Sequence, residues 1–328
     1  MPEMTVDLDV IRRNAKKIAS RTPLCAVVKA NAYGHGAVAV TRALRGIARS
    51  FAVATADEAE ELTDFGVREE ILILGNARRT VRADNVVYTV SSFEDVDRLS
   101  REGAFSFAVA VDTGMHRFGA APSDARLLVA YASRHGNVRS VYTHLRDHTD
   151  AQLSEKQYGL FAEATGDDVL RHISASGGLL LDKKFRMDEV RIGIALYGGM
   201  PGQLQAMTVT APVLAVRNIP AGEGVGYGSR VFMHDTTVAV VGIGYADGYR
   251  RLTAPRTLLI CGRECKVLSV CMDVCFAELP KGVRRADRAV ITGRALPLTR
   301  LAESYGTITY EAMTCFGSRV KRIYTGEA

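Results

Sequence analysis

Short apolar runs alternate with helix-like stretches through the first two-thirds of the chain, and this alternation most constrains the fold. Eight runs have the character of buried strands: 24–29, 50–54, 71–74, 86–90, 106–112, 138–144, 169–175 and 190–196. Repeated strand–helix units favour a parallel sheet, because each crossover returns the chain to the same edge. Eight such units in about 200 residues predict a (β/α)8 TIM barrel, an α/β fold at the short end of its size range.

Helix signals stand between these runs. Thr55 and Glu58 form a capping box, which predicts a helix starting there. A helix opening at Ser123 would place Leu127, Leu128 and Tyr131 on its apolar face and would end at Gly136 in a left-handed conformation. The spacing of strand and helix signals therefore supports the barrel.

The pattern of apolar runs changes after about residue 206. Apolar runs of strand length then alternate with turns that contain glycine, and one late helical stretch lies near 296–305. This pattern indicates a second, mainly β domain. We therefore predict two domains, a barrel over residues 1–206 and a β-rich domain over residues 207–328.

Composition and charge limit the kinds of partner and the location that we expect for this chain. The formal charge of +6 comes from scattered basic residues, so no nucleic-acid role is expected, whereas a small anionic ligand fits. Neither a signal peptide nor an apolar stretch long enough to cross a bilayer is evident. The six cysteines indicate reduced thiols and a cytoplasmic location, and their four-residue spacings are wider than those of zinc knuckles. No metal is predicted.

Polar residues cluster where the predicted strands end. Lys29, Arg117, His144 and Ser176 end or follow the first, fifth, sixth and seventh runs, and Arg191 lies early in the eighth. In a (β/α)8 barrel the active site lies at the carboxyl ends of the strands. A lysine in an apolar strand tends toward a lowered pKa, which suits an amine that forms imines.

The segment VVKANAYGHG (27–36) resembles the lysine segment of the fold-type III amino acid racemases, the alanine racemases above all, which bind pyridoxal 5′-phosphate (PLP). Similar motifs follow in order: DTGMHRFG (112–119), YTHL (142–145), VRIGIALYG (190–198), GIGYADGYR (242–250) and CMD (271–273). The family fold is a PLP-binding (β/α)8 barrel followed by a β domain. The resemblance implies a cytoplasmic homodimer with shared active sites that interconverts L- and D-alanine and supplies D-amino acid for peptidoglycan.

The resemblance also implies residue roles. Lys29 would hold PLP as a Schiff base and act as one of two bases, and Tyr245 of the partner subunit would act as the other. The cofactor-binding residues would be Lys29, Tyr33, His144, Ser176, Arg191, Gly193 and Ile194. The residues near the substrate would be Arg117, Met272 and Asp273. A permanently charged guanidinium at the pyridine nitrogen weakens the electron sink, which favours reprotonation over decarboxylation.

Three positions depart from the family pattern. Ala110 replaces a lysine whose carbamate orients the arginine, so Arg117 must be held by another group. Ala175 replaces an asparagine that bonds the cofactor, and Ser318 replaces a tyrosine that narrows the entry, which would admit serine or another small amino acid. Two alternatives stay open: a catalytically impaired PLP-binding or regulatory protein, and a fold-type III amino acid decarboxylase.

Overall fold

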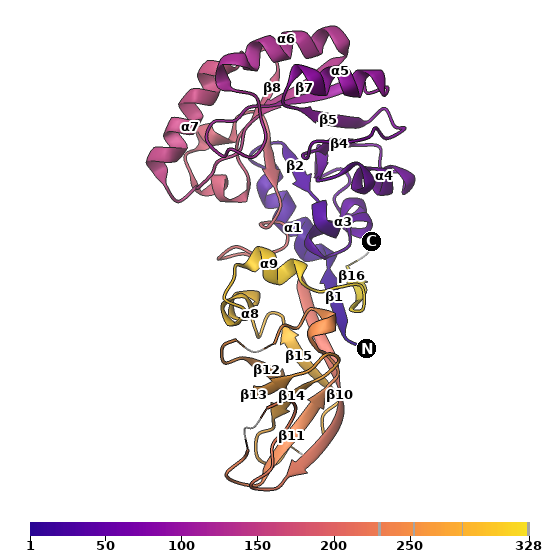
Figure 1. Ribbon diagram of the computed structural model, residues 1–328, viewed down its shortest axis with the longest axis vertical. Coiled ribbons are helices and arrows are strands. Elements are labelled where there is room, and N and C mark those ends of the chain that lie inside the picture. The colour runs from indigo at the N-terminus through magenta and orange to yellow at the C-terminus, as the bar shows by residue number, and fades with distance from the viewer. Residues whose placement is uncertain (229–230, 252, 284, 327–328) are drawn as a thin grey trace. The chain divides into compact units, whose positions relative to one another are not determined.

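The protein is described here from a computed structural model covering residues 1–228, 231–251, 253–283 and 285–326 (Figure 1). The chain forms two compact units. The barrel unit comprises Arg12–Ala32 and Gly36–Leu196, and the C-terminal unit comprises Met1–Ile11, Tyr33–His35 and Tyr197–Ala328. Short segments from the first part of the chain thus belong to the C-terminal unit. The domain boundary between residues 206 and 207 stays a prediction.

The barrel unit is built on one parallel sheet in the order β8-β7-β6-β5-β4-β3-β2-β9. Backbone amides of Asp188 and Arg191 donate to the carbonyls of Arg171 and Ser174, at 3.1 Å and 2.9 Å, and join the two edge strands. The eight predicted strands and the (β/α)8 fold class are confirmed. The strands are β2 (Leu24–Val27), β3 (Ser50–Val53), β4 (Glu70–Ile73), β5 (Val86–Val90), β6 (Ser106–Ala110), β7 (Asn137–Tyr142), β8 (Leu170–His172) and β9 (Val190–Ile192).

Helices occupy most of the connections between these strands (Figure 1). They are α1 (Leu8–Ala19), α2 (Lys29–Tyr33), α3 (Ala37–Ala43), α4 (Ala56–Asp64), α5 (Phe93–Arg101), α6 (Ala125–His135) and α7 (Ala151–Ala164), with 3-10 turns η1 (Pro122–Asp124), η2 (Ser176–Leu180) and η3 (Lys183–Arg186). Thr55 caps α4 and Ser92 caps α5, since each hydroxyl accepts the amide three residues on. Strands β2, β3 and β5 are buried at every position, as parallel strands covered on both faces are.

Three details of the barrel differ from the sequence prediction. The connection 74–85 between β4 and β5 contains no helix. Leu127 is 65% exposed, because the buried stripe of α6 runs through Ala125, Leu128 and Ala132. Gly136 is extended, with φ 173°, and is not left-handed. Its glycine is required for space, since an added Cβ would lie 2.6 Å from the carbonyl oxygen of Phe105.

The C-terminal unit is a largely antiparallel sheet, as the β-rich pattern predicted. Six strands pair in a closed ring, β10-β11-β14-β13-β12-β15. Strand β1 pairs antiparallel with residues 207–210 of β10 and parallel with β16. The elements are β1 (Glu3–Asp7), β10 (Met207–Ile219), β11 (Thr236–Val241), η4 (Tyr245–Asp247), β12 (Thr257–Ile260), β13 (Arg263–Val270), β14 (Cys275–Glu278), β15 (Arg288–Thr292), α8 (Leu298–Ser304), α9 (Thr309–Thr314) and β16 (Lys321–Thr325).

A search of the described residues finds no helix with the length and apolar character needed to cross a membrane.

The crowding at Gly136 gives a test of why glycine stands there. Gly136→Ala and Gly136→Asn should both destabilise the protein by about 1–3 kcal/mol, because any Cβ overpacks against Phe105. Gly103, with φ +93° and open space around its Cβ direction, is the matched control. Gly103→Asn should be milder, since asparagine tolerates left-handed backbone. Urea unfolding checks both, and a well-tolerated Gly136→Asn would contradict the packing explanation.

Candidate active site

Lys29 follows β2 at the carboxyl end of the barrel strands, and its side chain is half-buried. Within the described chain its amine has neither a hydrogen bond nor an ion pair. Burial lowers the pKa of Lys29, as do the charges of Arg117 and Arg191, and the charge of Glu58 opposes this lowering. A lowered pKa leaves a larger fraction of the amine neutral and therefore able to act as a nucleophile or to accept a proton.

The residues after Lys29 form a left-handed turn. Ala30, Asn31, Ala32 and Tyr33 have φ between 52° and 54°, and none is glycine. Such backbone costs about 1–2 kcal/mol per residue, so other contacts must hold it. The Asn31 side chain accepts the Ala37 amide at 2.8 Å, and its carbonyl accepts the Gly36 amide at 2.9 Å. The chain therefore fixes the segment that carries Lys29 rather than leaving it a free loop.

Arg191 in β9 is a buried cation, and no acid in the described part of the chain is paired with it. Its Nη1 donates to Nδ1 and to the carbonyl of His172 at 2.8 Å and 2.9 Å, and Nη2 donates to the Thr143 carbonyl at 2.5 Å. Its Cζ lies 4.7 Å from the centroid of the Tyr142 ring. These bonds leave two of the five N–H donors of the guanidinium for an acceptor in the site.

The contact with Arg191 also fixes the protonation of His172. A guanidinium only donates, so Nδ1 of His172 must accept and its proton lies on Nε2. Burial, with the charge of Arg191, holds the pKa of His172 well below its ordinary value. The ring is therefore neutral.

His144 follows β7 and is also held neutral. Burial lowers its pKa to about 3, and the charges of Arg191, Arg117 and Lys29 act in the same direction. A neutral imidazole is better suited to packing against an aromatic ring than to donating a proton.

Gln157 of α7 ties the segments around His144 together. Its buried amide nitrogen donates to the His144 carbonyl and to Oγ1 of Thr113, each at 3.1 Å. Its amide oxygen accepts the Arg146 backbone amide at 2.9 Å. One side chain thus links the segments that follow β6 and β7.

Ser176 follows β8 and is buried beside the end of β9. Its Oγ accepts the backbone amides of Gly193 and Ala195, each at 3.3 Å. The hydroxyl proton has no acceptor in the described chain, and Ile194 lies buried between the two amides. With its oxygen accepting two amides, the hydroxyl can direct its proton at an anion such as a phosphate. The predicted donors were Gly193 and Ile194, whereas the structure directs the amides of Gly193 and Ala195 to the hydroxyl.

Arg117 lies in the loop after β6 and is exposed. Asp112 shapes this loop by accepting the amides of Gly114 and His116 at 2.9 Å and 3.0 Å. Among the described residues no acid is paired with Arg117, and buried Ala110 supplies no acceptor. Its positive charge adds to burial in lowering the pKa of Lys29.

The C-terminal unit brings together its own predicted site residues. Tyr245 opens η4, is 39% exposed, and its amide donates to the Cys271 carbonyl at 3.0 Å. Gly244 permits this approach, since an added Cβ would lie 2.2 Å from the Met272 carbonyl oxygen. Met272 and Asp273, in the turn between β13 and β14, are exposed as well. The three predicted side chains therefore share one exposed region of this unit.

Tyr33 also belongs to the C-terminal unit. Its ring packs 5.1 Å from that of Tyr197 and 6.3 Å from that of Tyr310, measured between centroids. Burial raises the pKa of Tyr33, so the phenol stays protonated and can donate a hydrogen bond.

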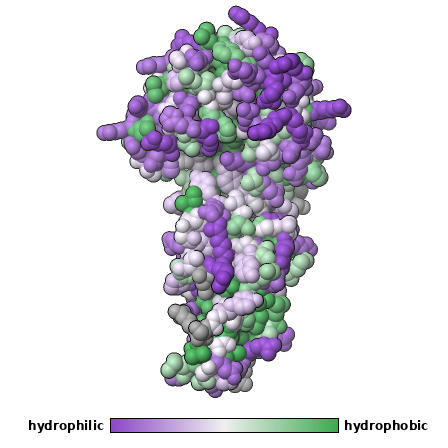
Figure 2. Space-filling model, viewed as in Figure 1, coloured by the Kyte–Doolittle hydropathy of each residue, from purple (hydrophilic) through white to green (hydrophobic). Residues whose placement is uncertain are grey.

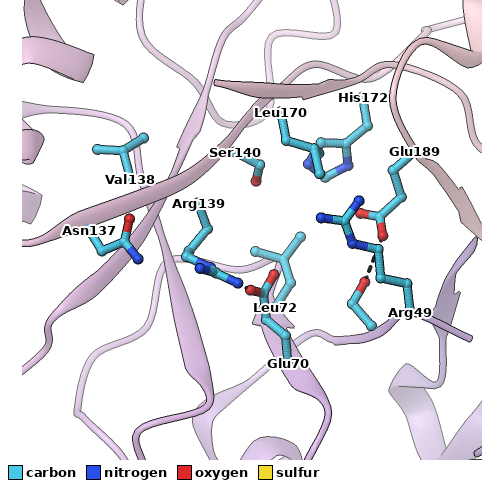
Figure 3. Close-up of a pocket in the computed structure, with 11 residues that line it drawn as sticks. Arg49, Glu70, Leu72, Asn137, Val138, Arg139, Ser140, Leu170, His172 and Glu189 are labelled. Carbon is cyan, nitrogen blue, oxygen red and sulfur yellow. Dashed lines mark hydrogen bonds and ion pairs between the residues drawn. The ribbon is translucent and has the colours of Figure 1, made fainter. Parts of the chain in front are cut away.

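A polar chamber of about 200 Å³ lies at the opposite, amino-terminal ends of the strands (Figure 3). Figure 3 shows Arg139 directed at Glu70. Nε of Arg139 donates to the Glu70 carboxylate at 2.7 Å, and Oγ of Ser50 donates to the Glu189 carboxylate at 3.1 Å. None of the predicted site residues lines this chamber. The strand-end cluster around Lys29 is therefore the candidate active site.

Comparison with known proteins identifies the family. The pattern described as alanine racemase, N-terminal domain, matches residues 6–201, and that of the alanine racemase C-terminal domain matches residues 206–324. The chain belongs to the alanine racemase family. This is a family of PLP-dependent isomerases, so the resemblance read from the motifs is confirmed.

Individual relatives of the family match along nearly the whole chain. An alanine racemase of Aliivibrio salmonicida is 34% identical, over 97% of this chain and 98% of that protein. The alanine racemase of Bacillus anthracis with bound L-Ala-P is 29% identical with a TM-score of 0.91, covering 99% of this chain and 95% of that one. The alanine racemase of Streptomyces lavendulae is 30% identical with a TM-score of 0.89, covering 100% and 97%.

Several residues of the site escaped the sequence prediction: Glu58, His172, Gln157 and Ala195. Gln157 carried a detectable signal, because a glutamine on the buried face of a helix needs partners there. The roles of the others depend on strands that are distant in the sequence.

The half-buried His144 predicts a particular dependence of stability on pH. Its pKa of about 3 lies below the value of about 6.5 in an unfolded chain, so the unfolded state binds more protons between these values. Stability should therefore fall as the pH drops through this window. His144→Gln should flatten that fall, whereas exposed His234→Gln should not. Urea midpoints from pH 4 to 7 test this, and equal slopes for His144→Gln and wild type would contradict it.

Proposed function

We propose that this chain interconverts L- and D-alanine by a two-base mechanism that uses PLP held by Lys29. The observation that carries the proposal is the unpaired Lys29 amine, of lowered pKa, at the strand ends of a barrel whose family is PLP-dependent. The family relationship spans both units.

The residues present fit PLP. The Lys29 amine would bind its aldehyde carbon, and Ser176 with the neighbouring amides of the 193–195 turn would bind its phosphate, as would the phenol of Tyr33. The spare N–H donors of Arg191 suit the pyridine nitrogen, which accepts when unprotonated. The neutral ring of His144 would pack on the pyridine.

Bound PLP would supply the electron sink that makes the α-proton of an amino acid labile. The protein supplies the proton transfers. Racemisation needs one group on each face of the α-carbon, and Nζ of Lys29 would serve one face while Oη of Tyr245 would serve the other. The positive charge of Arg191 would keep a proton off the pyridine nitrogen, which favours reprotonation of the α-carbon.

We infer that Tyr245 acts from a partner subunit in a homodimer with shared active sites. Support comes from the C-terminal unit, whose exposed large apolar residues include Leu214, Tyr227, Met233 and Met272. Figure 2 shows apolar residues gathered on part of this unit. Exposed apolar surface of this kind is typical of an interaction surface.

The substrate carboxylate would be bound by the free guanidinium of Arg117, with Met272 and Asp273 of the partner nearby. A small amino acid fits such a site. The exposed Ser318 would leave the entry wider than a tyrosine would, so serine is proposed as a second substrate. The unpaired cysteines favour a cytoplasmic enzyme, and D-alanine made there would supply peptidoglycan synthesis.

Racemisation and subunit sharing can be tested together. Purified protein with PLP should convert L-alanine to D-alanine and the reverse, measured by chiral chromatography. Lys29→Ala and Tyr245→Phe should each lose nearly all activity. When the two variants are unfolded together and refolded, heterodimers carry one intact shared site, so activity should return to about a quarter of wild type.

Each variant refolded alone is the control for this mixture. No recovery in the mixture would contradict a site shared between subunits. A Tyr245→Phe enzyme that racemised normally from both directions would remove the two-base mechanism, and a wild type inactive on every amino acid would remove the racemase proposal.

The entry residue predicts substrate preference. Wild type should racemise L-serine at a rate comparable with L-alanine, because a pocket cannot strongly reject what it has room for. Ser318→Tyr should lower kcat/KM for serine by about tenfold and spare alanine, whereas Ser318→Ala should leave the ratio unchanged. A wild type that strongly prefers alanine, or a ratio that Ser318→Tyr leaves unaltered, would refute the wider entry.

A further inference from the structure

The carboxylate of Glu58 has an unexpected pair of partners. Thr55 caps α4 and accepts the Glu58 amide at 3.2 Å, which is half of a capping box. In a complete box the Glu58 carboxylate would return to the amide of Thr55. Instead it accepts the Ala54 amide at 2.7 Å and the Ala30 amide at 2.6 Å. The side chain is thus directed away from its own helix and toward the segment of Lys29.

These two amides lie at the ends of neighbouring strands. Ala54 follows β3 and Ala30 follows Lys29 after β2, and β2 and β3 pair in parallel. The amide of Ala30 is the peptide group joined to the carbonyl of Lys29, so the bond to Glu58 fixes the backbone on that side of the lysine. It also holds the first residue of the left-handed turn.

The charge of Glu58 matters as well. Among the described residues, the positive guanidiniums of Arg117 and Arg191 act on the amine of Lys29, and the carboxylate of Glu58 opposes them. A carboxylate that accepts two amides is held in place, so its position relative to Lys29 is constant.

We propose that Glu58 is the positioning residue of Lys29, holding its backbone through the Ala30 amide and offsetting the positive charge around its amine. The inference rests on the proposed use of Lys29 to hold PLP. It assigns to Glu58 no contact with substrate or cofactor.

The experiment compares Glu58→Gln with Glu61→Gln, an exposed position on the same helix α4. Glutamine keeps the shape but offers one acceptor oxygen to two amides and no charge. The first measurement is the rate at which the full-length apoprotein captures PLP, followed by absorbance across pH. For Glu58→Gln, the rate of PLP capture should fall, because the backbone of Lys29 is held less firmly. The pH profile of capture should also move to lower pH by roughly half a unit to one unit, because a compensating negative charge is lost.

The second measurement is kcat and KM for alanine in the loaded enzyme. We expect kcat to fall about tenfold with little change in KM, since a misplaced amine slows proton transfer more than substrate binding. Glu58→Asp, which keeps the charge on a shorter arm, should restore the pH profile of capture but not the full rate. Glu61→Gln should match wild type throughout.

The outcomes are distinct. The proposal is wrong if Glu58→Gln captures PLP like Glu61→Gln at every pH. It is also wrong if Glu58→Gln loses only thermal stability while the folded variant keeps the wild-type pH profile of PLP capture. In either case Glu58 is merely a helix-cap residue. If Glu58→Gln does not fold, Glu58→Asp decides by the same profile. A wild type that captures PLP but does not racemise refutes the proposed function alone, and one that captures no PLP refutes both.

Discussion

The site depends on the hydrogen bonds that the buried guanidinium of Arg191 makes. It donates to carbonyls that follow or end β7 and β8 while sitting in β9, so three neighbouring strands are held at one charged group. Burying a charge is costly unless it is hydrogen-bonded, and here three of the five N–H donors of Arg191 bond two carbonyls and a histidine nitrogen, while its guanidinium lies over the ring of Tyr142. Burial lowers the pKa of both Lys29 and His144, and the charge of Arg191 adds to this lowering.

The electrostatics of the site follow from this arrangement. Lys29 lies among positive charges that favour its neutral form, and the histidines near Arg191 are held neutral by burial and by the same charges. The site therefore has an amine of lowered pKa, two neutral histidine rings and, at Arg117, a guanidinium that is paired with no acid among the described residues. That combination suits an anionic cofactor and a substrate carboxylate better than it suits a cation.

Much of the fold could be predicted from the sequence, and the particular failures share one cause. The eight strands were visible because buried parallel strands are continuous apolar runs. The reason for glycine at position 136 was wrongly predicted. Its side chain is excluded by the carbonyl of Phe105, which lies in the connection between β5 and β6, and not by a left-handed backbone. The capping box at Thr55 was half correct, since local spacing predicts the hydroxyl bond but not the diversion of the Glu58 carboxylate to Ala30.

The sequence by itself determined the order of strands, the chemistry-bearing residues at their ends and the family, because apolar periodicity and short motifs are local properties. Only the tertiary structure decided which donors meet which acceptors. Glu58 reaches an amide 28 residues earlier, and Arg191 bonds a carbonyl 48 residues earlier. Such pairs meet because the parallel sheet brings its carboxyl ends together, and no local pattern encodes which of them will touch.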